Sequence, residues 1–123
     1  MAVDVLIVDD SAAMRKVLQR VLKQAEVPLG EVYEAADGLE ALEKLKTVTV
    51  ALILAEINLP NMDGLELLSR LKAHPEWKDL PVVMVTAEGG QSKVVKAAQL
   101  GAAGYVRKPF STEQIKMTLS GLL

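Results

Sequence analysis

The sequence predicts an α/β fold in which five parallel strands are covered on both faces by five helices. Short aliphatic segments alternate with segments whose apolar residues recur every three or four positions, as in strands alternating with amphipathic helices. Residues 6–8 and 52–54 are also continuous aliphatic runs, which are characteristic of strands buried on both faces of a parallel sheet. Both observations favour units in which each strand is followed by a covering helix.

The five expected strands are short and are separated by proline, glycine or charged residues. They cover residues 3–8, 32–35, 51–55, 82–85 and 104–106. The first expected helix places apolar residues from Met14 to Ala25 on one face, with Ser11 as its N-cap. The other four helices are indicated by Leu39, Leu42 and Leu45, by Leu65, Leu68 and Leu71, by Val94, Ala98 and Gly101, and by Ile115, Leu119 and Leu122. We expect Asp63 to cap the third helix, Ser111 or Thr112 to cap the fifth, and small residues to form the inward face of the fourth.

Length and composition indicate one cytoplasmic domain over residues 1–123. A chain of 123 residues that is 50% apolar can fill a single core. The formal net charge is −2 and no long basic run is present, so direct nucleic-acid binding is not expected. The absence of cysteine excludes disulfides and thiolate metal sites, and no apolar run approaches the length of a membrane span. The last expected helix ends with the chain, so we expect no output domain.

Polar side chains stand at the expected carboxyl ends of four strands. Asp9 and Asp10 follow the first strand, Glu56 follows the third, Thr86 follows the fourth, and Lys108 lies just past the fifth. Ligands of open α/β sheets bind at this edge, where the strand order reverses. Crowded carboxylates need a cation between them, and Mg²⁺ takes carboxylate, carbonyl and phosphate oxygens. The set suits Mg²⁺ and a phosphoryl group, although Asp9 and Asp10 taken alone are also compatible with a solvated turn.

Four motifs carry a resemblance to a known family. They are Val8-Asp9-Asp10-Ser11 with Met14-Arg15, Leu59-Pro60-Asn61-Met62-Asp63-Gly64, Val85-Thr86-Ala87, and Gly104-Tyr105-Val106-Arg107-Lys108-Pro109-Phe110. With these motifs in order, the chain from about Val5 onward resembles the CheY-like receiver domains of response regulators in two-component phosphorelay signalling. The resemblance implies a doubly wound, flavodoxin-like sheet in the order 2-1-3-4-5.

The resemblance also implies roles for individual residues. Asp9 and Asp10 would hold Mg²⁺ together with the backbone carbonyl of Asn58 and the side chain at position 56, which is the phosphoacceptor position. Thr86 and Lys108 would contact phosphoryl oxygens, and the Lys108-Pro109 peptide would be cis. Thr86 and Tyr105 would form the conformational switch.

The implied partners are proteins, and the implied activity is signalling rather than enzymatic. A histidine kinase or a phosphotransfer protein would supply the phosphoryl group. A downstream effector would dock on the face formed by the fourth helix, fifth strand and fifth helix. Neither nucleic acid nor a membrane is an expected partner.

Position 56 departs from the family pattern, because glutamate stands where an aspartate is expected, four residues before Pro60. Its extra methylene moves the carboxylate about 1.5 Å further, roughly one C–C bond length. A misplacement of about 1 Å can slow a reaction on the order of a hundredfold. We therefore expect a receiver that is phosphorylation-deficient or that mimics the phosphorylated state. A natural phosphate-independent receiver, an engineered mimic and a natural receiver that tolerates Glu56 all fit the sequence.

Two other functions were weighed against this one. A small Mg²⁺-dependent phosphatase of haloacid-dehalogenase type also uses an acid, a hydroxyl and a lysine at strand ends, but it requires an aspartate nucleophile and a second acid where Asn58 stands. A flavin carrier would need a phosphate loop after the first strand, where Asp9 and Asp10 would repel phosphate.

Several other residues are expected on loops or on the surface. We expect His74 to be a loop residue and Trp77 to cover the third helix, and we expect Gly89-Gly90 to belong to the switch loop. Lys93, Lys96 and Lys116 are compatible with a partner-binding face and with simple solubilisation.

Overall fold

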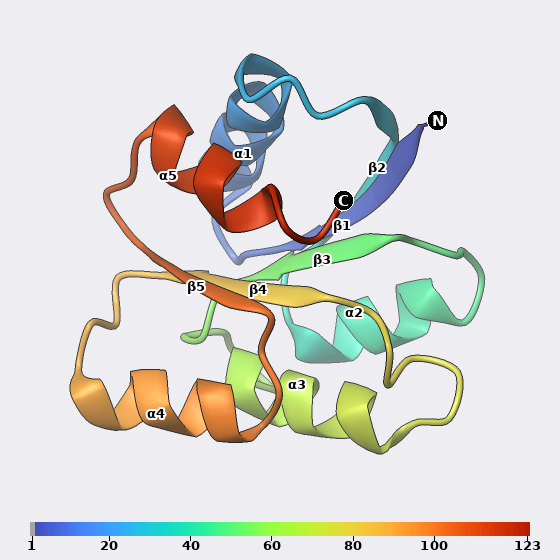
Figure 1. Ribbon diagram of the computed structural model, residues 1–123. Helices are drawn as coiled ribbons and strands as arrows, with labels where there is room; N and C mark the ends of the chain where they lie inside the picture. The colour runs from blue at the N-terminus through green and yellow to red at the C-terminus, as the bar shows by residue number, and fades with distance from the viewer. Residues whose placement is uncertain (1) are drawn as a thin grey trace.

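The computed structural model describes residues 2–123 and shows one five-stranded sheet (Figure 1). All strand pairs are parallel and the order is β2-β1-β3-β4-β5, which confirms the predicted fold class. The strands are β1 (Val3–Val8), β2 (Leu29–Ala35), β3 (Leu52–Ala55), β4 (Val82–Thr86) and β5 (Gly104–Arg107).

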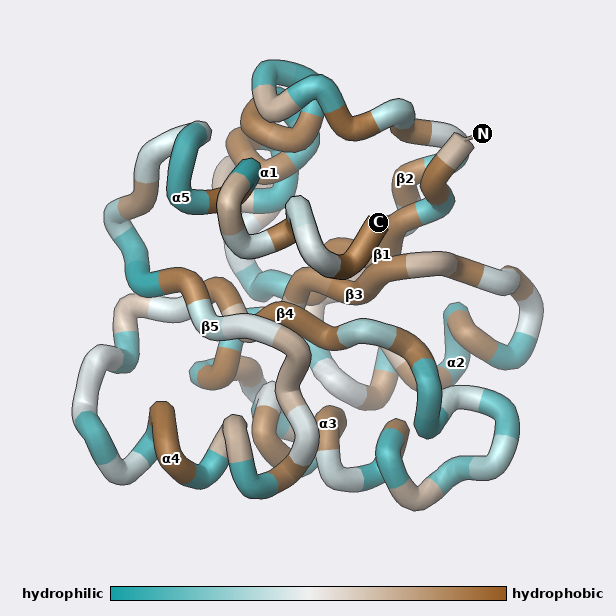
Figure 2. Tube along the Cα trace, in the orientation of Figure 1, coloured by the Kyte–Doolittle hydropathy of each residue, from teal (hydrophilic) through white to brown (hydrophobic). Residues whose placement is uncertain are grey.

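Five helices cover the two faces of the sheet, with α1 and α5 on one face and α2, α3 and α4 on the other (Figure 1). They are α1 (Ala12–Gln24), α2 (Gly38–Leu45), α3 (Gly64–Ala73), α4 (Gln91–Gln99) and α5 (Thr112–Leu119). Hydropathy follows this layering, because the strands in the middle are mostly apolar while polar residues recur on the outer turns (Figure 2). Each face of the sheet therefore has its own aliphatic core cluster. No helix within residues 2–123 is long and apolar enough to cross a bilayer.

Three expected N-caps are present. The Ser11 side chain accepts a hydrogen bond from the N–H of Met14, and Asp63 accepts one from the N–H of Glu66. Ser111, one of the two candidates for the fifth helix, forms a capping box with Gln114. Each cap satisfies an amide that would otherwise lack a partner at the helix start.

The inward faces of two helices differ from the prediction. Val94, Ala98 and Gly101 are exposed, whereas Ala97 is buried and Leu100 packs against the core. The expected face of α4 was therefore wrong by about one residue, because its small apolar residues fall in two adjacent pairs, Val94-Val95 and Ala97-Ala98, which do not define a unique inward face. On α2, Leu39 is 49% exposed while Leu45 is buried, so Leu39 was also wrongly expected inside.

Strand β2 begins at Leu29, three residues before the predicted start. Pro28 and Gly30 resemble loop residues in the sequence. In the structure Leu29 pairs with Val3, and the register shifts between Val3 and Val5. The Asp4 carboxylate accepts the N–H of Glu31 at 2.8 Å inside this irregularity, so a side chain replaces a regular strand contact.

Candidate functional site

The fold brings two of the predicted acidic residues together at one edge of the sheet. Strands β1 and β3 are neighbours, and Val8 pairs with Ala55, so Asp9 and Glu56 leave adjacent strands at the same level. Asp9 is 2% exposed and Glu56 is 7% exposed, so both carboxylates are largely removed from water. A buried carboxylate without a partner is strongly unfavourable, so this pair needs a cation.

Lys108 supplies that cation. Its Nζ donates to Oδ2 of Asp9 at 2.8 Å and to Oε1 of Glu56 at 2.9 Å, and its side chain is 16% exposed. The residue follows β5, and the Lys108-Pro109 peptide is cis as the resemblance implied. We call Asp9, Glu56 and Lys108 the strand-end site. Its three charged groups form a compact cluster that carries one net negative charge.

The two carboxylates change the proton affinity of the lysine. Burial lowers the pKa of Lys108, but hydrogen bonds and charge from Asp9 and Glu56 outweigh that effect and raise its pKa above the ordinary value. The ammonium form is therefore favoured at neutral pH, and it is the form that can neutralise the two carboxylates.

The second oxygen of Glu56 turns back toward its own backbone. Oε2 accepts the N–H of Ile57 at 2.7 Å and the N–H of Asn58 at 3.2 Å. With Oε1 bound to Lys108, both oxygens have charge-assisted partners and the long side chain is fixed. Gly64 allows α3 to start close to the backbone of Glu56, because a Cβ there would lie 2.1 Å from the Glu56 carbonyl oxygen.

The loop after β4 is joined to the two residues expected to form the conformational switch. The Thr86 hydroxyl is buried at the end of β4 and accepts the N–H of Glu88 at 3.1 Å. The Tyr105 hydroxyl donates to the Glu88 carbonyl, and its ring packs against the core. Burial raises the pKa of Tyr105, and the negative charges of Glu88 and Glu56 raise it further, so the hydroxyl keeps its donor proton. The loop thus bonds to both residues expected to switch.

The expected metal ligands are not gathered into a closed ion-binding cluster. Asp10 and Asn58 are exposed, and Lys108 occupies one oxygen of Asp9 and one of Glu56. Within residues 2–123 no group of three or more His, Asp or Glu side chains is arranged to hold a metal ion. The donors still fit a hard dication chemically, because carboxylates and a backbone carbonyl are the ligands that Mg²⁺ accepts.

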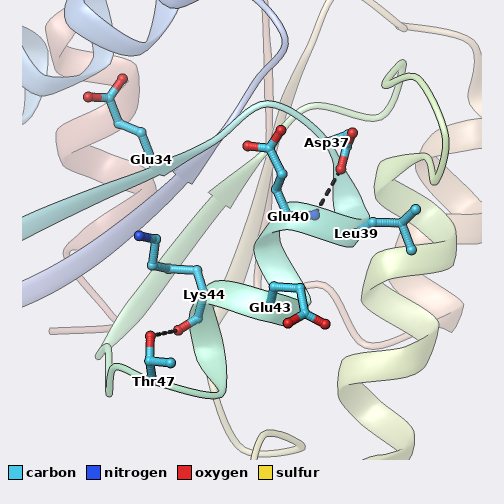
Figure 3. A pocket seen from close by; sticks show the side chains of 7 residues that line it. All are labelled: Glu34, Asp37, Leu39, Glu40, Glu43, Lys44 and Thr47. Atoms are coloured by element: carbon cyan, nitrogen blue, oxygen red, sulfur yellow. Dashed lines mark hydrogen bonds between the residues drawn. The ribbon is translucent and has the colours of Figure 1, made fainter.

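A separate groove of about 470 Å³ lies beside α2 (Figure 3). Its acids already have partners: Glu34 pairs with Arg15, Glu43 with Lys46, and Glu40 accepts the N–H of Ala36. Asp37 is buried there and caps α2 through the N–H of Glu40, as the dashed line in Figure 3 shows. No residue of the strand-end site lines the groove. The acids of the groove take part in ion pairs and helix capping, so they have a structural role.

Sequence reasoning did not assign roles to Asp37, Glu88 or Arg15. Asp37 accepts the side-chain amide of Asn61 at 2.7 Å, which joins α2 to the loop before α3. The N–H of Glu40 lowers the pKa of Asp37, and the Asn61 bond lowers it further. Its position just before Gly38 could have indicated a helix cap. Arg15 belongs to the Met14-Arg15 motif, but its contacts with Asp9 and Glu34 could not be inferred from spacing.

Comparisons with known proteins agree with this geometry. A family model described as the response regulator receiver domain matches residues 5–120. The curated chemotaxis protein CheY-3 of Vibrio cholerae is 38% identical over 115 residues, which are 94% of this chain and 87% of that protein. The solved structure of the chemotaxis response regulator CheY4 of Vibrio cholerae is similar with a TM-score of 0.86 and 33% identity, and the match covers 100% of both chains. The solved Mn²⁺-bound form of response regulator Rcp1 has a TM-score of 0.79 and 29% identity, over 97% of this chain and 90% of that one.

Proposed function

Because the chain belongs to the response regulator receiver domain family, we propose that it acts in two-component signalling as a docking module whose pocket is occupied by its own glutamate. The observation that carries this proposal is the contact of Lys108 with Glu56 at 2.9 Å. In the family resemblance this lysine contacts the phosphoryl group. Here a carboxylate at the acceptor position already receives its ammonium group.

Glu56 is therefore a poor acceptor and an incomplete mimic of the phosphorylated state. One oxygen is bound to Lys108 and the other to two backbone amides, so neither is free for in-line attack on phosphorus. As a mimic, the carboxylate offers one charge and two oxygens, against nearly two charges and three oxygens for a phosphoryl group. We propose that the pocket holds a fixed or weakly responsive state.

The position of Tyr105 supports a docking state. Its hydroxyl donates to the Glu88 carbonyl and its half-buried ring packs against the core, which suits an aromatic held in one fixed orientation. The face of α4, β5 and α5 beside it exposes Val95 at 44% and Met117 at 74%, with Lys93 and Lys96 on α4. Exposed apolar side chains on a face that also carries lysines suit a protein effector, and we propose this face as its docking surface.

We also propose that Mg²⁺ binds weakly at Asp9, Asp10 and the Asn58 carbonyl, with Glu56 as a further potential ligand. The oxygen donors of this chain and the Mn²⁺-bound form of the similar regulator Rcp1 support the proposal. When bound, such an ion would offset the charge of an incoming phosphoryl group. Lys108 competes for the same Asp9 oxygen, which limits the affinity.

The remaining expectations follow from family membership. A histidine kinase or phosphotransfer protein remains the proposed donor, a cytoplasmic location remains a prediction, and so does a single domain over residues 1–123. Receiver domains act in general as signalling modules, and the family match does not favour the phosphatase alternative.

Phosphate uptake by two variants tests the proposal. The wild-type protein should gain no adduct from acetyl phosphate in Mg²⁺, whereas Glu56→Asp should gain roughly 80 Da by intact mass, because the shorter side chain returns the nucleophilic oxygen to attacking distance. Glu66→Asp, the same change at a half-exposed position of α3, is the matched control and should gain nothing. An adduct on the wild-type protein would contradict the proposal. A folded Glu56→Asp protein that stays unmodified would show that the pocket has lost more than its acceptor.

A further inference from the structure

Asp9 is held by hydrogen bonds at each of its polar atoms. Its N–H donates to the Ala35 carbonyl of β2 at 3.0 Å. Its Oδ1 accepts the N–H of Ser11 at 2.8 Å, and its Oδ2 accepts Lys108 at 2.8 Å. Its backbone carbonyl accepts Nη1 of Arg15. The carboxylate is thus aimed by a backbone that is itself fixed at both ends.

Arg15 differs from the other partners because it is a side chain that binds the backbone carbonyl of Asp9 and is not itself part of the strand-end site. The residue lies at the end of the first turn of α1, and its Nε donates to Oε1 of Glu34 on β2 at 2.7 Å. Gln19, one turn further along α1, donates to the other Glu34 oxygen at 3.4 Å. The Arg15 side chain is only 16% exposed, so its contacts are partly shielded from water. One guanidinium therefore joins α1, the edge strand β2 and the end of β1.

We infer that Arg15 is a positioning residue that aims Asp9 at Lys108. The orientation of the Asp9 carbonyl is set by the same backbone rotation that directs the chain through Asp10 to Ser11. Ser11 in turn supplies the amide that holds Oδ1, which leaves Oδ2 pointing at the ammonium group. The planar guanidinium holds two acceptors at a fixed angle, which a flexible ammonium group cannot do.

The inference rests on the proposed function and deepens it. It names a residue that sets the orientation of the Asp9 carboxylate without contacting either of its oxygens. Removing Arg15 leaves the Asp9 carbonyl without its side-chain donor, whereas the exposed Glu34 keeps its contact with Gln19. An acceptor that loses its partner in a buried setting destabilises its surroundings, and here the effect falls on the segment of residues 9–11.

Nuclear magnetic resonance at fixed neutral pH tests the inference on three variants. In Arg15→Ala, we expect the side-chain carboxyl ¹³C signal of Asp9 to shift and the Ser11 amide to exchange about tenfold faster than global unfolding explains. Arg15→Lys should show a smaller change in the same direction. The control Arg70→Ala removes an exposed arginine paired with Glu66 on α3 and should leave both signals unchanged. Urea unfolding of each variant supplies the global reference.

Two outcomes overturn the inference. One is an unchanged Asp9 signal in folded Arg15→Ala, and the other is a Ser11 acceleration that the whole sheet shares, which would mean a purely structural role. If Arg15→Ala does not fold, the decision falls to Arg15→Lys and Glu34→Gln, and no shift in either overturns it. Titration with MgCl₂ separates the proposals: a wild-type protein that binds no Mg²⁺ contradicts the metal site and leaves the Arg15 result intact.

Discussion

The ammonium group of Lys108 lies 2.9 Å from Oε1 of Glu56, although 52 residues separate them in the sequence. The same nitrogen lies 2.8 Å from Asp9, 99 residues away. One cation therefore links the ends of β1, β3 and β5. The family resemblance assigns this lysine to a phosphoryl oxygen, and here its ammonium group is already paired with the carboxylate of Glu56.

Removing this cation should lower stability markedly. Lys108→Met leaves two adjacent, nearly buried carboxylates without their shared partner, and we expect a loss of about 2–4 kcal/mol in the free energy of unfolding at neutral pH. Lys46→Met is the matched control, because Lys46 is 61% exposed and pairs only with Glu43. Its effect should stay within about 0.5 kcal/mol in urea unfolding. Equal effects of the two changes would contradict the role given to Lys108.

Lys108→Met should strengthen Mg²⁺ binding, although it lowers the stability of the protein. In the wild-type protein we expect weak, millimolar binding seen as amide shifts at residues 9, 10 and 56–58, because Lys108 already occupies Asp9 and Glu56. In Lys108→Met the freed carboxylates should bind the ion more tightly, and added MgCl₂ should restore part of the lost stability. Weaker binding in the variant would show that Lys108 does not compete with the metal.

Asp37 should contribute a pH-dependent part of the stability. Its folded pKa lies below the ordinary value of 3.8, chiefly through the N–H of Glu40. A depressed carboxyl pKa adds stability that is fully present above the unfolded pKa and is lost as pH falls through the folded value. Asp37→Asn keeps a capping side chain but cannot ionise. The stability difference between the wild type and this variant should shrink as pH falls below about 4, measured by urea unfolding; a constant difference would contradict it.

The close approach of Gly64 to Glu56 should make this glycine hard to replace. The Cβ of Gly64→Ala would lie 2.1 Å from the Glu56 carbonyl oxygen, which is backbone and has little room to move. We expect a loss of about 1–3 kcal/mol from overpacking. Gly121→Ala is the control, because nothing lies within 4 Å of its added Cβ. A thermal unfolding midpoint unchanged in Gly64→Ala would show that the loop after β3 can shift.

The architecture was predictable because buried parallel strands leave continuous aliphatic runs such as residues 52–54. The edge where Asp9, Glu56 and Lys108 meet was predictable too, since parallel strands end together. The inward face of α4 was not, because Val94, Val95, Ala97 and Ala98 leave its rotation undetermined until the sheet is packed beneath it. The way in which Glu56 divides its two oxygens between Lys108 and the amides of the next two residues was equally beyond the sequence, because it depends on the local path of the backbone.

Trp77 gives the molecule a built-in fluorophore whose place determines what it can report. It is the one tryptophan of the chain, and its ring stacks on His74 with centroids 3.9 Å apart and planes 18° apart. Both residues lie in the loop that leads into β4, at the end of the sheet opposite to Lys108. Its emission should therefore follow loss of the folded core, whereas events at Glu56 should leave it unchanged. A fluorescent signal from the acceptor end would require a second tryptophan placed there.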